Sequence, residues 1–120
     1  MDSLLGNSMA IAKLSMDAAS LRHEAIASNI ANVNTPGYVP LKVNFEEQLN
    51  ALSENNEQNR LSEVKPFIEQ ESPSAGVTPQ VALDMEVVKL NVNTLHFQSL
   101  VKLANKYISL LGTAINEGKR

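Results

Sequence analysis

The ten residues NIANVNTPGY at positions 29–38 indicate how this chain folds, because they close a long segment with helical apolar spacing. Thr35 offers a side-chain oxygen to nearby backbone N–H groups, and the proline after it disfavours the helical conformation at Thr35. Pro36 and Gly37 fit the central positions of a type II turn, where glycine supplies the positive φ. The stretch therefore predicts a helix end, a tight turn, and a Tyr38 ring that folds back on the helix.

Upstream of this turn, residues 1–33 are predicted to form one long helix with two apolar stripes. One stripe follows the alternating four-three spacing of a coiled-coil seam and has one polar member. It consists of Leu5, Met9, Ala12, Met16, Ala19, His23, Ile26, Ile30 and Val33. The other stripe lies on the opposite side of the helix, since each residue advances by about 100°. It consists of Leu4, Ile11, Leu14, Ala18, Leu21 and Ala25.

A helix with two opposed apolar stripes needs cover from both sides, whereas an ordinary surface helix has one stripe. Only one other long helix is predicted in this chain, so the missing cover is expected from other subunits. An isolated copy is then expected to be partly unfolded and to fold on assembly. The alternative is that Leu14 and Leu21 are scattered surface apolar residues, which are common in soluble proteins.

Residues 84–118 are predicted to form the second long helix, preceded by Thr78-Pro79 and ended by Gly118. Two neighbouring seams give it an apolar arc of roughly 160°, wider than the ~100° stripe of a surface helix. One seam contains His96, Leu100, Leu103, Tyr107, Leu110 and Ala114, and the other contains Leu90, Phe97, Val101, Ala104, Ile108, Leu111 and Ile115. One edge of this arc can meet the first helix, and the rest again requires a neighbour.

Residues 34–83 are predicted to be a mostly irregular, partly disordered middle segment that contains all five prolines of the chain. Residues 39–45 alternate as an extended strand does, and residues 45–52 fit a short helix. A mobile region is expected at about 50–62, where apolar residues are scarce. Residues 64–68 fit a short strand interrupted by Pro66. The predicted fold is mainly α, an elongated two-helix hairpin in one structural unit.

Composition limits the possible functions. The 120 residues allow one domain, and the net charge of −3 leaves no basic patch for nucleic acid. The absence of cysteine excludes disulfides and thiolate metal sites. His23 and His96 are the only histidines, and neither belongs to a metal-binding or catalytic motif. We therefore expect no enzyme activity, no catalytic or metal-binding residues and no cofactor.

No apolar run has the length of a membrane span, so no membrane insertion is expected. The residues Met1-Asp2-Ser3-Leu4-Leu5 lack the basic beginning of a secretory signal peptide. If the protein leaves the cytoplasm, we therefore expect it to do so without a cleaved signal.

The string Ser28-Asn29-Ile30-Ala31-Asn32, followed by Thr35-Pro36-Gly37-Tyr38, resembles the N-terminal signature of the axial proteins of the bacterial flagellum, which form its rod, hook and junctions. Arg22-His23 before it, and Val81 to Glu86 at the second helix, extend the likeness to about residues 1–45 and 77–118. The short middle segment is similar to that of the rod subunits, because hook subunits carry large β domains there. The matching turn residues are Asn29, Asn32, Thr35, Pro36, Gly37 and Tyr38.

The resemblance implies a structural subunit of the flagellar basal body, whose helices pack into the tubular drive shaft that crosses the periplasm. It implies export through the flagellar type III apparatus, and as partners FlgC-type and neighbouring rod subunits, a FliE-type adaptor and the export gate. The expected assembly interface combines both helices: Leu5, Met9, Ala12, Leu14, Met16, Ala19, Leu21, Ile26, Ile30, Phe97, Leu100, Val101, Leu103, Tyr107, Ile108, Leu110, Leu111 and Ile115.

Phe45 and Leu49 also fit the short pattern by which early flagellar substrates engage the export gate. The alternative is a local packing pair. A rival to the rod subunit as a whole is a soluble helical adaptor or export chaperone of a type III secretion system, because two apolar stripes would also serve to bind a partner helix.

Overall fold

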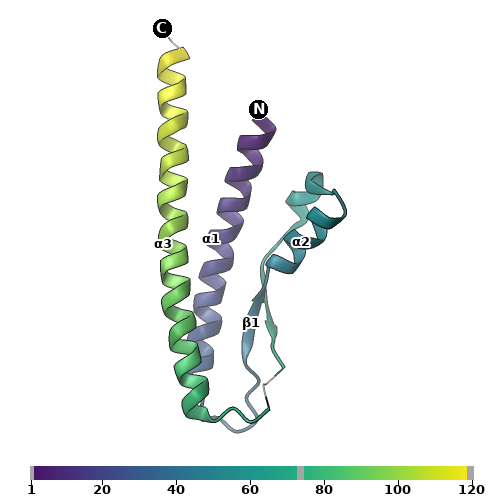
Figure 1. The fold of residues 1–120 in the computed structure, drawn as a ribbon, viewed down its shortest axis with the longest axis vertical. Coiled ribbons are helices and arrows are strands. Elements are labelled where there is room, and N and C mark those ends of the chain that lie inside the picture. The colour runs from purple at the N-terminus through teal and green to yellow at the C-terminus, as the bar shows by residue number, and fades with distance from the viewer. Residues whose placement is uncertain (1, 73–74, 119–120) are drawn as a thin grey trace.

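The computed structural model describes residues 2–72 and 75–118, with side chains from Gly6 onwards, as an elongated molecule of 65 × 30 × 15 Å. Three columns lie side by side in Figure 1: α3, then α1, then the middle segment. The prediction of a mainly α fold with two long helices is confirmed. The elements in chain order are α1 (Asp2–Ala31), β1 (Leu41–Asn44), α2 (Glu46–Glu54), η1 (Gln58–Glu63), β2 (Phe67–Gln70) and α3 (Pro79–Gly118).

The helices α1 and α3 form an antiparallel pair along the first predicted stripe of α1. Ala12, Ala19 and Ile26, each seven residues apart, are buried on this stripe. The backbone carbonyl of Ala19 accepts a hydrogen bond of 2.8 Å from the Asn93 amide of α3. The small alanine side chains permit this close approach, since a longer side chain at position 19 would hold α3 away.

The helix α3 is longer than α1 and projects beyond it. Because Asn93 contacts Ala19 in an antiparallel pair, residues whose numbers add up to about 112 lie side by side. Residues 111–118 therefore have no α1 residue beside them, and they extend about 12 Å further at 1.5 Å per residue. Figure 1 shows this overhang at the end where both termini lie.

The second stripe of α1 packs against the middle segment of the same chain. Ala18 and Ala25 form a buried cluster with Val43, Phe45 and Val64, and Leu14 and Leu21 pack against that cluster. The prediction that other subunits cover this stripe is therefore wrong, and so is the alternative that Leu14 and Leu21 are scattered surface residues. The prediction failed because the strands and the short helix of the middle segment have too few residues to show a strong apolar pattern in the sequence. Together these elements cover about four turns of α1.

The middle segment is a small module built on a two-stranded antiparallel ribbon, in which Leu41 of β1 pairs with Gln70 of β2. The helix α2 begins with Glu46 and Glu47, whose charges favour a helix N-terminus, and ends before Asn56, which adopts a positive φ of 54°. Gln48 binds both the N–H and the C=O of Lys65, so α2 is tied to the chain that enters β2.

Several predicted boundaries differ from the structure, and the helix predicted at 1–33 ends at Ala31. The helix α3 begins at Pro79 instead of residue 84, because the Thr78 hydroxyl caps it by accepting a hydrogen bond from the Val81 N–H, and proline suits the first helical position. The strand predicted at 64–68 lies at Phe67–Gln70, after Pro66. The region 50–62 contains the end of α2 and η1, and its mobility stays a prediction.

None of the helices in the described residues is both long enough and apolar enough to cross a membrane.

Candidate assembly surface and signature turn

The turn after α1 has the predicted geometry. The Tyr38 N–H donates to the Thr35 carbonyl over 3.2 Å, and Gly37 has a φ of +76°, as the third residue of a type II turn requires. Asn32 supports the helix end, because its amide donates to the Ser28 carbonyl and its oxygen accepts from the Thr35 hydroxyl. The chain direction after α1 is thus fixed by hydrogen bonds within ten residues.

Asn29 connects this turn to the middle segment. Its side chain is 5% exposed, and its amide pairs with the backbone of Leu41 as a strand would, donating to the carbonyl over 2.9 Å and accepting from the N–H over 2.8 Å. The Tyr38 hydroxyl donates to the same Asn29 oxygen and lies 2.9 Å from the Ser28 hydroxyl. The expected return of the Tyr38 ring to the helix is confirmed, and one buried amide joins α1, the turn and β1.

One side of α3 presents exposed apolar residues in four-three spacing: Val81, Met85, Val88, Val92 and Leu95, with Leu95 exposed by 65%. This seam lies beside the side that carries the Asn93 contact, and Met85, Val88 and Val92 also line the groove described below. Sequence analysis missed this third seam, although its spacing was readable from the sequence. Such a contiguous stripe on a surface helix is typical of a contact with another protein.

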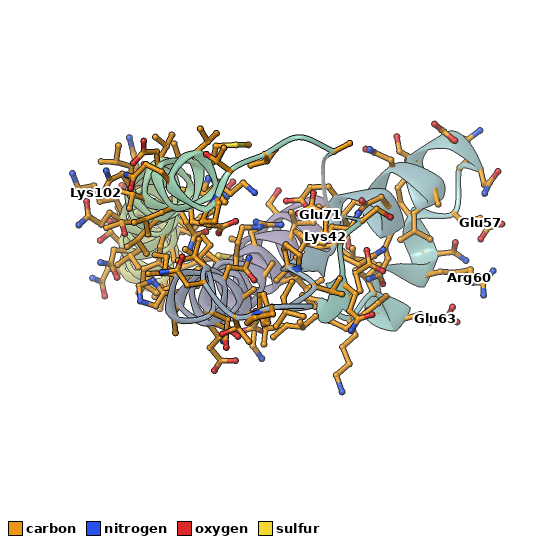
Figure 2. The ribbon with its side chains drawn as sticks, turned by 90° about the horizontal axis from the view of Figure 1, so that it is seen from below. Lys42, Glu57, Arg60, Glu63, Glu71 and Lys102 are labelled. Atoms are coloured by element: carbon orange, nitrogen blue, oxygen red, sulfur yellow. The ribbon has the colours of Figure 1, made fainter. Side chains whose placement is uncertain are left out.

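A groove separates α3 from the ribbon of β1 and β2. Two hollows of about 490 and 240 Å³ form it, and they share Glu71, Glu86 and Lys89 as lining residues. In the larger hollow, Ile26 and Val43 contribute apolar surface opposite the exposed Val88 and Val92 of α3. Figure 2 shows Glu71 and Lys42 on the ribbon side of the molecule, while Lys102 projects from α3 at the far side.

Two polar side chains of α3, Glu86 and Asn93, line this groove. Their burial was not predicted from the sequence. Glu86 and Asn93 are only 7% and 5% exposed, because they lie on the side of α3 that packs against α1. Lys89 donates to one Glu86 oxygen over 3.4 Å. Among the described residues, nothing donates a hydrogen bond to the other Glu86 oxygen or to the Asn93 amide oxygen. Buried acceptors without donors are rare, so these two oxygens call for an explanation.

The predicted interface residues fall into three groups. Ala12, Ala19 and Ile26 are buried within the chain, and Met9, Leu14, Met16, Leu21, Ile30, Leu100 and Tyr107 are half-buried. Phe97, Val101, Leu103, Ile108, Leu110, Leu111 and Ile115 are exposed on α3 and remain open to a neighbour. The side chain of Leu5 lies outside the described residues. A role in assembly stays a prediction for all of them.

The two histidines do not occupy the packed positions expected from their spacing. Both His23 and His96 are exposed. Arg22, the residue before His23, is half-buried instead and forms an ion pair of 3.0 Å with Glu46 of α2.

Phe45 is 3% exposed at the centre of the buried cluster, and Leu49 packs against that cluster. The alternative that these two residues are a local packing pair describes their place in the fold. Recognition by an export gate stays a prediction, and it would require the middle segment to be unfolded.

Arg60, which lies far from the groove, has a shifted pKa. Arg60 binds Glu63 and Glu57 at the outer end of the middle segment, and these hydrogen bonds raise the pKa of its guanidinium, Glu63 having the larger effect. Figure 2 shows the three residues together at the edge remote from α3. A raised folded-state pKa gives a stabilisation that is complete below the unfolded value and is lost only above it. The raised pKa of Arg60 therefore gives no pH dependence near neutrality.

A long antiparallel helix pair, closed by a fixed turn and apolar along one free face, defines a class of elongated helical subunits suited to side-by-side packing. Residues 14–38, which include the signature turn, match the family described as flagella basal body rod protein.

Curated relatives give the same result over a longer stretch. The chain is 28% identical to the flagellar basal body rod protein FlgB of Bacillus subtilis (strain 168), over 87% of this chain and 89% of the relative. It is 38% identical to FlgB of Borreliella burgdorferi over 50 residues, which cover 42% of this chain and 37% of the relative. The resemblance to flagellar rod proteins is thus confirmed, and within them the similarity is to FlgB.

Proposed function

We propose that this protein is a structural subunit of the proximal rod in the bacterial flagellar basal body, where it assembles by helix packing. The observation that carries the proposal is the exposed seam Val81, Met85, Val88, Val92 and Leu95 on a helix whose neighbouring side is already packed against α1. Together with the matched rod signature at 14–38, this leaves α3 as the element that meets neighbouring subunits.

The mechanism is mechanical. Within each subunit, α1 is held between α3 and the middle segment, so a force on α3 is passed through α1 to the rest of the chain. Between subunits, packed apolar side chains resist sliding because protein interiors have low compressibility. A tube of such subunits would transmit torque through the motor-driven shaft without a moving joint inside the subunit.

The setting that we propose is the one implied by the resemblance to flagellar axial proteins, and no site in this chain supports it separately. The subunit would lie in the periplasmic part of the rod after passage through the flagellar type III export gate, without a cleaved signal. Its partners would be further copies, FlgC-type rod subunits and a FliE-type adaptor. Because Phe45 and Leu49 are packed in the folded chain, an export gate could read them only before the middle segment folds.

The proposal is tested by complementation of motility in a bacterium that lacks the gene for this protein. Val92→Asp places a charge in the exposed seam at a side chain that is 60% exposed, and is expected to abolish swimming. The matched control is Gln98→Asp, an exposed polar position on another face of α3, and it is expected to swim normally. Circular dichroism of both purified variants should give the helicity of the unmodified chain. Normal swimming by the Val92→Asp strain would remove the support that α3 gives to this function.

A further inference from the structure

We infer that Asn93 sets the register in which α3 packs on α1, at a cost in stability, and so decides which end of α3 stays free. This role of Asn93 is independent of the proposed function, since it concerns packing within one chain. Three observations carry it: the buried hydrogen bond from Asn93 to Ala19, the buried oxygens without donors on the same side of α3, and helix lengths that admit a second register.

The side of α3 that packs on α1 repeats every seven residues. One position of the repeat is occupied by Glu86, Asn93, Leu100, Tyr107 and Ala114, and the other by Leu83, Leu90, Phe97, Ala104 and Leu111. From residue 83 to residue 107, all of these side chains except Phe97 are buried or half-buried. A shift of α3 by seven residues therefore keeps the same side against α1.

The helix lengths admit one such shift. In the observed register, paired residue numbers add up to about 112, so residues from about 81 to 110 of α3 lie beside α1. If α3 moved seven residues toward the signature turn, or about 10 Å, residues from about 88 to 117 would cover α1 equally well. A shift in the other direction would need residues from about 74 onwards, whereas α3 begins at Pro79. Length therefore excludes one shifted register and permits the other.

The observed register is the less favourable one for Glu86. One oxygen of its carboxylate is buried without a donor. After the shift, Glu86 would be level with residue 33, past the end of α1 at Ala31, where that helix no longer covers it. Leu100 would then face Ala19. Because a buried acceptor without a donor lowers stability, Glu86 and the apolar Leu100 both favour the shift, and another contact must hold the observed register.

Asn93 supplies that contact. Its amide donates to the Ala19 carbonyl over 2.8 Å, and its side chain is 5% exposed. An amide can approach a helix carbonyl this closely because the alanine side chain is small. In the shifted register Asn93 would face Ile26, whose larger side chain blocks the approach, and the amide would stay buried without its bond. A polar residue in a helix–helix seam can select one register in this way at a cost in stability.

The register decides what α3 presents to its surroundings. In the observed register, residues 111–118 project beyond α1 at the end where both termini lie. After the shift, residues 79–87 would project at the other end instead, next to the signature turn. Asn93 thus determines which part of α3 is free.

Exchanging a small and a large residue of α1 tests this role. In the double variant Ala19→Ile, Ile26→Ala, the alanine that Asn93 requires lies seven residues further along α1, so α3 is expected to shift by seven residues. Since the chain has no cysteine, spin labels can be attached at Ala27→Cys and Asn105→Cys, which are exposed positions. The labels are separated mainly along the helix axis, by about 30 Å, and the shift is expected to shorten this distance by about 10 Å. An unchanged distance in double electron–electron resonance, at the helicity of the unmodified chain, would overturn the inference.

A second variant decides the question even if the exchanged α1 does not fold. Asn93→Leu removes the amide and leaves α1 unmodified, so the same labels are expected to give an additional distance about 10 Å shorter than the first. The urea midpoint is not expected to fall, because an apolar side chain replaces a buried polar one. Asn91→Leu, at an exposed position of α3, is the matched control and is expected to give the original distance alone. The original distance alone in Asn93→Leu would show that the connection 71–78 or apolar packing holds the register, and that Asn93 does not.

Discussion

Single amides hold the parts of this molecule together. Asn29 pairs with both backbone groups of Leu41, and Gln48 does the same with Lys65, so each side chain acts as one residue of an additional strand. A buried backbone group without a partner is costly, and these two amides satisfy groups that no neighbouring strand reaches. The presence of Asn29 in the signature thus has a structural explanation, because its side chain docks the middle segment on α1.

Replacing Asn29 by alanine should therefore weaken the whole fold. The Leu41 N–H and C=O would lose their partners in a buried place, and the expected loss in the free energy of unfolding is about 2–4 kcal/mol. Urea denaturation followed by circular dichroism measures this loss. Asn34→Ala, at an exposed position of the same turn region, is the control and should change stability by less than about 0.5 kcal/mol. Equal stability of the two variants would show that the Asn29 amide bonds do not hold β1.

At the scale of residues, features set by neighbours in the sequence were predictable, whereas features that depend on residues far away in the sequence were not. The turn at residues 35–38 could be derived from the sequence because proline and glycine set their own backbone angles. The roles of Glu86 and Asn93 could not, since their environment depends on α1 residues more than sixty positions away. A polar residue in an apolar seam is ambiguous until the partner helix is placed.

At the scale of elements, the middle segment determines how much of α1 is exposed. The spacing correctly indicated two packed sides of α1, although His23 and Ile11 are exposed, but it did not show what covers the second side. Strand β1 has four residues and α2 has nine, so neither shows enough repeats to reveal which side is apolar. The capping threonine of α3 was similarly passed over, because Pro79 looked like a boundary rather than a first helical residue.

Phe45 is the side chain through which the middle segment is anchored. Phe45→Ala is expected to lower the free energy of unfolding by about 3–5 kcal/mol, because it removes a large buried ring from the cluster on α1. Phe67→Ala is a matched control, since the Phe67 ring is 47% exposed and should cost far less. Hydrogen exchange of the α2 amides would distinguish the variants: rapid exchange is expected for Phe45→Ala only. Slow exchange in both would mean that α2 is held by contacts other than Phe45.

In the whole molecule, both apolar sides of α1 from Ala12 to Ala25 are packed within the chain, whereas α3 has many exposed apolar side chains. A lone copy therefore covers this part of α1, and assembly is supported by α3 and by the similarity to rod proteins. We therefore expect an isolated copy to be unfolded only at the end of α3, where residues 111–118 have no neighbouring helix.

Changes at this end should separate stability from assembly. The double variant Ile108→Ser, Ile115→Ser is expected to unfold within about 1 kcal/mol of the unmodified chain, because both side chains are nearly 60% exposed. Complementation of motility is expected to fail with the same variant. A large loss of stability would mean that the chain itself covers these residues, and full motility would mean that the end of α3 has no partner.

Concentration-dependent sedimentation distinguishes a rod subunit from the rival export chaperone. A chaperone that binds a partner helix is expected to form a closed, compact dimer with one cooperative melt. A rod subunit is expected to show association that increases steadily with concentration. A single sharp dimer species would favour the chaperone.

Both termini lie at one pole of the molecule, and the signature turn lies at the other, with α3 extending past α1 by about two turns. The molecule itself has no twofold symmetry that exchanges these poles. A filament in which such subunits pack in parallel is therefore directional, and its two tips are chemically unlike. Addition of a subunit at one tip and at the other would then proceed at different rates.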